Sequence, residues 1–268
     1  MQEVTKYPAG TFSWTDLMTT DQDAAKTFYT SLFGWAINDV PMGPDSFYTM
    51  LEINGKSVAA LSQMSEEQQA QGMPSAWNSY VTVDDADASA KKASELGGTL
   101  IAEPFDVFDA GRMAVIQDPT GAIFSVWQAK QHIGAHYVNY PNTMSWNEIS
   151  TKDPAKAKEF YAGLFGWELS DQDMGNGMIY TSFTNNGRPN GGMMELTAEY
   201  GDIPSHWTVY FSVEDCDTAV AKVKELGGQA LFEPQDIPDT GRFAMVQDPQ
   251  GAVFTIIQLD RADGPPQG

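Results

Sequence analysis

Two acidic residues of this chain occupy matching places in a repeated motif. Asp16 belongs to Ser13-Trp14-Thr15-Asp16-Leu17, and Glu148 belongs to Ser145-Trp146-Asn147-Glu148-Ile149. A carboxylate that points into an apolar pocket loses hydration, which raises its pKa and suits it to act as a general base near neutral pH. An ionised carboxylate would instead attract a cationic ligand. A carboxylate with a purely structural role would instead accept a hydrogen bond from a neighbouring hydroxyl, or pair with Arg112 or Arg242. Asp16 and Glu148 are therefore the candidate catalytic residues.

The motif is one part of a repeat that covers most of the chain. Leu32-Phe33-Gly34-Trp35 returns as Leu164-Phe165-Gly166-Trp167, at the same spacing that separates Asp16 from Glu148. Gln117-Asp118-Pro119 returns as Gln247-Asp248-Pro249 at a slightly smaller spacing, so one loop of the second half is two residues shorter. A repeat of this length is a domain rather than a solenoid unit. The sequence predicts two domains, residues 8–130 and 139–260, and gives each residue a twin at the equivalent position of the other domain.

A weaker repeat inside each half divides it into two modules. Strand-like residues 14–19 and 78–83 each lead into a helix, which begins after Asp21 or Asp85 and ends at a glycine. Aspartate caps a helix N-terminus, and glycine readily adopts the left-handed conformation that ends a helix. Three short strands follow each glycine. The predicted fold class is therefore α+β, with four βαβββ modules paired into two tandem domains.

Strand alternation decides which side chains accompany the two acids. Residues two apart on a strand point to the same face, so Trp14 and Asp16 share a face, as do Asn78 and Tyr80. An aromatic-walled pocket with one carboxylate is a common site for a planar or cationic organic molecule. The pattern leaves open the alternative that the tryptophans only fill the interior. The candidate ligand-binding residues are Trp14, Asn78, Tyr80, Trp127, Trp146, Thr208 and Tyr210.

Composition excludes some classes of partner. The chain has 268 residues and a net charge of −21 that is spread over both halves, which argues against binding nucleic acid or an anionic membrane. No stretch approaches the ~20 apolar residues of a membrane helix, and residues 1–6 lack the features of a signal peptide. The single cysteine, Cys216, fits a reducing compartment. We therefore expect a cytoplasmic protein, monomeric or homodimeric, whose partner is a small molecule.

Together these motifs resemble a known family. The helices that end in Phe-Tyr-x-x-Leu-Phe-Gly-Trp, the paired modules and the Asp-Pro-x-Gly hairpins resemble those of the vicinal oxygen chelate superfamily. That superfamily includes glyoxalase I, extradiol dioxygenases and bleomycin-resistance proteins. The resemblance covers Gly10 to Leu259 and implies the fold rather than one activity. It also implies that a curved mixed sheet encloses a cavity in each domain, where the enzymes of the family hold a divalent metal through His and Glu side chains on facing strands.

The resemblance implies four metal-ligand positions in each domain, and none carries a histidine or a carboxylate. These positions are Trp14, Ala60, Asn78 and Ser125, with the twins Trp146, Gly192, Thr208 and Thr255. Chemistry at a divalent metal needs at least three such ligands and an open position. His132 and His136 lie in the linker, and Glu195 lies close to the position of Gly192. We expect no metal and no cofactor, and ligands displaced from these positions are the alternative.

The sequence thus favours a metal-independent small-molecule binding protein of the glyoxalase/bleomycin-resistance type, with a planar or cationic organic ligand in an aromatic-lined cavity. Two alternatives stay open. One is a lyase or isomerase that uses Asp16 or Glu148 as general base. The other is a divalent-metal enzyme, similar to a glyoxalase or dioxygenase, whose ligands are displaced.

Overall fold

The computed structural model describes residues 1–44, 46–175 and 177–260. In the first half the strands are β1 (Phe12–Thr19), β2 (Ala36–Gly43), β3 (Ser46–Ile53), β4 (Lys56–Gln63), β5 (Ala76–Thr82), β6 (Thr99–Val107), β7 (Gly111–Gln117) and β8 (Ile123–Ala129), and the helices are α1 (Gln22–Phe33), the short α2 (Glu66–Ala70) and α3 (Ala86–Glu95). In the second half the strands are β9 (Met144–Thr151), β10 (Glu168–Asp173), β11 (Ile179–Asn185), β12 (Arg188–Glu195), β13 (His206–Ser212), β14 (Gln229–Ile237), β15 (Gly241–Gln247) and β16 (Val253–Leu259), and the helices are α4 (Pro154–Phe165), α5 (Cys216–Glu225) and the 3₁₀ turn η1 (Ala198–Tyr200).

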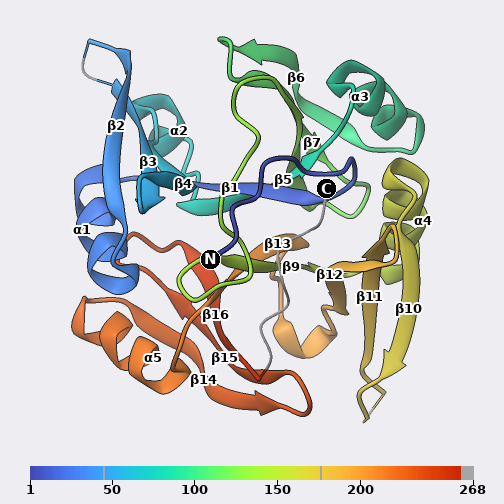
Figure 1. Ribbon diagram of the computed structural model, residues 1–268. Helices are drawn as coiled ribbons and strands as arrows, with labels where there is room; N and C mark the ends of the chain where they lie inside the picture. Colours follow the sequence, from blue (N-terminus) through green and yellow to red (C-terminus); the bar gives the residue numbers. More distant parts are fainter. Residues whose placement is uncertain (45, 176, 261–268) are drawn as a thin grey trace.

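The strands form two mixed sheets of eight strands each, one from each half of the chain (Figure 1). The order is β2-β3-β4-β1-β5-β8-β7-β6 in the first sheet and β10-β11-β12-β9-β13-β16-β15-β14 in the second. The first strands of paired modules, β1 with β5 and β9 with β13, run antiparallel at the centre of each sheet. Within the described ranges neither sheet closes into a barrel. The predicted α+β class with two tandem domains is therefore confirmed.

The helices begin and end at the residues that local chemistry favours. Asp21 Oδ1 accepts a hydrogen bond of 3.0 Å from the backbone N–H of Ala24 at the start of α1. Asp153 does the same at the start of α4. Gly34 follows α1 with a φ of 70°, a left-handed conformation that a residue with a Cβ adopts only at a cost. The caps fix where the chain turns back toward its sheet.

Burial identifies the two faces of each sheet. Leu17 on β1 and Ile149 on β9 are fully buried in the core, in the clusters that hold the helix residues Tyr29 and Tyr161. The acids Asp16 and Glu148 precede them by one residue, so they point to the opposite face. We call this face, away from the helices, the inner face of each sheet.

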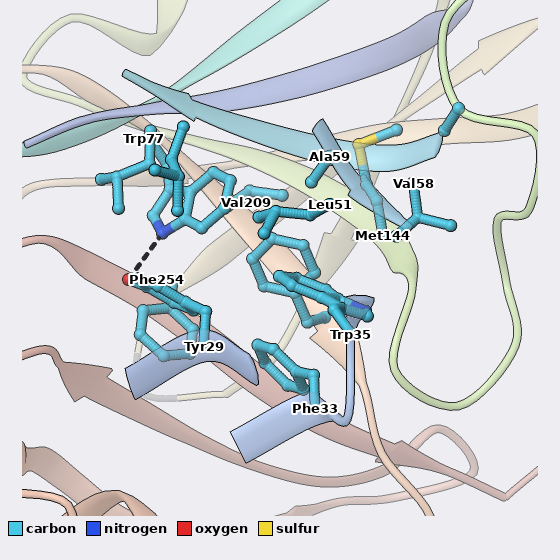
Figure 2. Packing of buried hydrophobic residues seen from close by; sticks show 14 of the residues in the cluster. Tyr29, Phe33, Trp35, Leu51, Val58, Ala59, Trp77, Met144, Val209 and Phe254 are labelled. Carbon is cyan, nitrogen blue, oxygen red and sulfur yellow. Dashed lines mark hydrogen bonds between the residues drawn. The ribbon is translucent and has the colours of Figure 1, made fainter. Parts of the chain in front are cut away.

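The two halves pack as a pseudo-symmetric pair. α1 lies beside α5 and α3 lies beside α4, so each helix pair joins one half to the other (Figure 1). The core continues across this junction, where Val209 and Phe254 of the second half belong to the same cluster as Tyr29 and Trp35 of the first (Figure 2). Removal of this apolar surface from water holds the halves together.

A reciprocal pair of hydrogen bonds also joins the halves. The Tyr29 hydroxyl donates to Asp248 Oδ2 at 2.9 Å and accepts from Trp77 Nε1 at 3.0 Å, the bond dashed in Figure 2. The twin Tyr161 donates to Asp118 Oδ2 at 2.8 Å. In each case the tyrosine of a helix motif in one half binds the aspartate of an Asp-Pro-x-Gly hairpin in the other. We call these two contacts the interdomain clasps.

Candidate functional site

Asp16 lies at the centre of the first inner face. Its Oδ2 accepts hydrogen bonds from the hydroxyls of Tyr48 on β3 and Tyr80 on β5, both at 2.9 Å. Its Oδ1 accepts one from the Asn78 amide at 3.0 Å. Trp14 donates its indole N–H to the Tyr48 hydroxyl at 3.0 Å. The sheet register explains the grouping, because Asp16 is opposite Asn78 and Trp14 is opposite Tyr80. We call these five residues the first inner site.

Glu148 holds the same place in the second half. Tyr210 donates to Glu148 Oε1 at 2.9 Å, and the Tyr180 hydroxyl is also hydrogen-bonded to this carboxylate. Trp146 donates its indole N–H to the Tyr180 hydroxyl at 2.9 Å. Thr208 lies opposite Glu148 in the register and is buried. These five residues form the second inner site, so the structure brings together the predicted residues of each half.

The hydrogen bonds have a fixed direction in both sites. An indole N–H only donates, so the hydroxyls of Tyr48 and Tyr180 accept from tryptophan and their own protons point to the carboxylates. Burial raises the pKa of Asp16 and Glu148, and the tyrosine donors, which favour the ionised form, oppose this in part. Burial and the nearby carboxylate likewise raise the pKa of Tyr48 and Tyr180. A buried carboxyl of this kind is able to exchange a proton with a bound molecule.

Arg112 and Arg242 are not partners of these acids. They bind Asp87 on α3 and Asp217 on α5, each through Nε at 2.6 Å. Those helices lie on the far side of the sheets from the inner sites. The idea that an arginine satisfies Asp16 or Glu148 is therefore wrong, and tyrosine hydroxyls do so instead.

The linker between the halves covers the tryptophan of the first inner site. The His132 ring meets Trp14 edge-on with centroids 4.4 Å apart, and its centroid is 5.8 Å from that of Trp127. Trp127 donates its indole N–H to the His132 carbonyl at 2.8 Å. The Ala135 N–H donates to the Ser13 carbonyl at 2.8 Å, which ties the linker to β1. As a result Trp14 is 3% exposed, and burial lowers the pKa of His132 to about 4. Trp14 and Trp127 thus lie beneath the linker.

The second inner site is less covered. Trp146 is half-buried and borders a cavity of about 240 Å³ at the start of β9, between the segment that precedes β1 and the turn that joins β11 to β12. In the sheet register Tyr210 pairs with Thr255 of β16, and Thr255 pairs with Met245 of β15. Met245 is half-buried. Phe232 of β14 pairs with Met245 and is exposed. Trp146, through which this cavity touches the second inner site, is therefore more accessible than Trp14, whereas Glu148 and Asp16 are each 7% exposed.

Two residues of these sites, Tyr48 and Tyr180, and the covering residue His132 were not among the predicted site residues. Tyr48 and Tyr180 are twins at the same spacing as Asp16 and Glu148, and alternation along β3 and β11 places them on the inner faces. The repeat therefore held a signal that could have found them. The role of His132 as a cover depends on the path of the linker, which no local pattern predicts.

The inner sites do not fit the divalent metal of the family. Each offers one carboxylate among phenol hydroxyls, and the part of the chain that the structure describes has no group of three or more His, Cys, Asp and Glu residues able to hold an ion. A Cβ at Gly192 would overlap the Tyr180 hydroxyl, so tyrosine fills the space of that ligand position. Glu195 lines a different cavity, beside α4. It is therefore not a displaced ligand of the second inner site.

Comparison with known proteins gives one family for both halves. The family model described as Glyoxalase/Bleomycin resistance protein/Dioxygenase superfamily matches residues 11–126 and 136–256. A Mycobacterium tuberculosis protein that carries the name glyoxylase CFP32 is 44% identical over 96% of this chain and 98% of its own. The anthracycline biosynthesis protein DauV of Streptomyces sp. strain C5 is 36% identical over 97% of each chain.

Solved structures of low identity share the fold. The Mn(II)-bound glyoxalase from Novosphingobium aromaticivorans is 15% identical, with a TM-score of 0.64 over 96% of this chain and 86% of its own. The 2,2',3-trihydroxybiphenyl 1,2-dioxygenase from Sphingomonas wittichii strain RW1 is 13% identical, with a TM-score of 0.65 over 96% and 93% of the two chains. At these identities the likeness shows the fold alone.

Among the described residues, no helix has the length and apolar character to cross a membrane.

Proposed function

The chain belongs to the glyoxalase/bleomycin resistance protein/dioxygenase superfamily, and from that premise we propose that it binds a planar organic molecule at its second inner site. The ring of the ligand lies against Trp146 and Tyr210, and Glu148 provides the polar contact. The observation that carries the proposal is a difference between twins. Trp146 is half-buried where a cavity of about 240 Å³ meets the second inner site, and it is the residue of that site that lines the cavity, whereas Trp14 is covered by His132.

The chemistry of the site favours such a ligand. Contacts between aromatic rings contribute about 0.5–1.5 kcal/mol beyond the burial of area. The groups that act on the Glu148 carboxylate within the described structure are tyrosine hydroxyls rather than cations, so a cationic group on the ligand would also be favoured there. Binding of this kind requires no metal or cofactor. The relative DauV is named for anthracycline biosynthesis, which agrees with an organic ligand.

An enzyme is the second candidate, and the buried carboxyl favours it. A substrate with an acidic C–H group at the second inner site would meet Glu148 as base, with a pKa raised toward the working range by burial. The reaction would then be an isomerisation or elimination that needs no metal. Asp16 is placed in the same way, but the tryptophan beside it, Trp14, is covered by the linker. The donor set of the inner sites gives no support to the alternative of a divalent-metal glyoxalase or dioxygenase.

The remaining expectations form part of the proposal. The partner is a small molecule rather than nucleic acid or a membrane, because 36 acidic residues outnumber 15 basic ones. The unpaired, buried Cys216 fits a cytoplasmic location. The two halves already form an internal pair, which fits a monomer or a homodimer.

Calorimetric titration of two probes tests the proposed site. The probes are 9-aminoacridine, which is planar and cationic, and anthraquinone-2-sulfonate, which is planar and anionic. Loss of the indole in Trp146→Phe should weaken at least one of them by about tenfold, equivalent to ~1.4 kcal/mol. The matched variant Trp14→Phe should bind as the wild type does. Equal binding by all three proteins, or a loss in Trp14→Phe alone, would place the site elsewhere.

Two substitutions of Glu148 distinguish a binding protein from an enzyme that uses Glu148 as general base. Glu148→Asp moves the carboxylate by one methylene, and Glu148→Gln removes its charge. In a binding protein the first change has little effect, and the second weakens 9-aminoacridine. In an enzyme that uses Glu148 as base both changes abolish turnover while affinity stays near normal, because catalysis is sensitive to a displacement of about 1 Å.

A further inference from the structure

A second cavity, of about 370 Å³, lies on the helix side of the second half, between α4 and strands β10 to β12. Its lining includes Pro154, Lys158, Asp171, Ile179, Thr181 and Glu195. Each of these positions has a twin in the first half, at the spacing that separates Asp16 from Glu148. The first half therefore shows what the same framework holds when this space is filled.

In the first half the Gln22 side chain fills the space. Its amide nitrogen donates to the Thr49 hydroxyl at 2.9 Å and to the Phe47 carbonyl at 3.1 Å. The backbone N–H of Gln22 donates to Gln63 Oε1 at 2.9 Å. Gln22 is 9% exposed. The framework at this position is thus arranged to accept hydrogen bonds from a buried N–H donor.

The second half keeps the acceptors and lacks the donor. Pro154 is the twin of Gln22, and proline has neither a side-chain amide nor a backbone N–H. Thr181 is the twin of Thr49 and is 1% exposed. Its hydroxyl donates a hydrogen bond to Asp171 at 2.7 Å. Its oxygen therefore remains an acceptor toward the cavity. Ile179 is the twin of Phe47, so its backbone carbonyl corresponds to the one that accepts a hydrogen bond from Gln22 in the first half.

The charge of the lining also differs between the halves. Glu195 replaces the neutral Gln63. Lys158 binds Asp171 at 2.7 Å, so it neutralises that acid and leaves Glu195 as the uncompensated charge of the lining. The positive end of α4 opposes a cation, but the carboxylate of Asp153 caps that end.

The second half has thus lost a neutral N–H donor and gained a negative charge. We infer that this cavity binds a small primary ammonium compound. The N–H groups of the ligand take the place of the glutamine amide, and its charge pairs with Glu195. This site is separate from the second inner site, so the inference does not rest on the proposed function.

Two probes test the inference by nuclear magnetic resonance at low salt. Butylammonium carries both charge and N–H donors, and tetramethylammonium carries the charge alone. Butylammonium should shift the backbone signals of Thr181 and Met193 in a saturable way. Tetramethylammonium should bind at least tenfold more weakly, because it has no N–H group to donate to the acceptors of the cavity. Equal binding of the two probes would indicate only general attraction to an acidic protein, and absence of saturable shifts would mean that there is no site. Either result overturns the inference.

Variants copied from the first half provide the matched controls. Pro154→Gln installs the side chain that fills the twin position and should abolish the shifts that butylammonium causes. Glu195 is exposed, so folding should tolerate Glu195→Gln, which should weaken binding by about two- to fivefold, the range for an exposed ion pair. Gln22→Ala opens the twin space and should add shifts at Thr49. Unchanged binding in both Pro154→Gln and Glu195→Gln would refute the site. Trp146→Phe should leave butylammonium binding intact, which distinguishes this test from that of the second inner site.

Discussion

Removal of one buried oxygen, in Tyr29→Phe, should destabilise the protein strongly and identify the interdomain clasp as a main contact between the halves. The Tyr29 hydroxyl is fully buried and makes two hydrogen bonds, one to Asp248 and one from Trp77. Asp248 is 3% exposed and Trp77 is 6% exposed. Neither partner has ready access to water in the variant.

The magnitude follows from these two bonds. A hydrogen bond to a charged group contributes about 1.5–3 kcal/mol, and a buried donor that is left without a partner costs about 1–3 kcal/mol. The Trp77 N–H becomes such a donor. The expected loss in the free energy of unfolding is therefore about 2.5–6 kcal/mol. For a protein of this size that corresponds to a fall in Tm of roughly 5–24 °C.

Urea unfolding followed by circular dichroism measures this loss. The twin variant Tyr161→Phe should lose a similar amount, since Tyr161 binds Asp118 at 2.8 Å and Trp207 at 2.8 Å. Tyr200→Phe is the control, because the Tyr200 side chain makes no hydrogen bond with another described residue. The wild type should unfold in one transition, since a continuous core joins the halves. A loss below about 1 kcal/mol in both clasp variants would refute this account of the clasps.

Two further predictions concern the pH dependence of stability. The folded-state pKa of Asp16 is raised above its unfolded value of about 3.9, so the free energy of unfolding falls as the pH rises through the folded-state pKa. Asp16→Asn should remove this part of the fall, and parallel curves for variant and wild type between pH 4 and 8 would contradict it. The pKa of His132 is lowered to about 4, so its contribution to stability is complete above the unfolded pKa of about 6.5 and is lost as the pH falls toward 4, by ~3 kcal/mol in all. His132→Phe should not show this loss, and a His132 ring that titrates near pH 6.5 by nuclear magnetic resonance would show that the linker does not bury it.

The elements of the fold and the composition of the inner sites could be predicted from the sequence, because they depend on local rules. Strand alternation placed Asp16 beside Trp14 and Glu148 beside Trp146, and aspartate caps and glycine ends marked the helices. The repeat then provided the pairing of modules. Arg112 and Arg242 were misjudged because the residues that they bind, Asp87 and Asp217, lie 25 positions away in helices on the opposite face.

The difference in exposure between the twin tryptophans depends on tertiary contacts. The twins Trp14 and Trp146 have the same local sequence pattern, yet the linker covers one of them, and the path of a linker depends on long-range contacts such as that of Ala135 with Ser13. The clasps likewise join residues 219 and 43 positions apart, from opposite halves. The local sequence is enough to predict which side chains share a face of a strand or helix, because the periods of strands and helices are local. The contacts between faces, halves and linker came from packing, which places residues together whatever their separation along the chain.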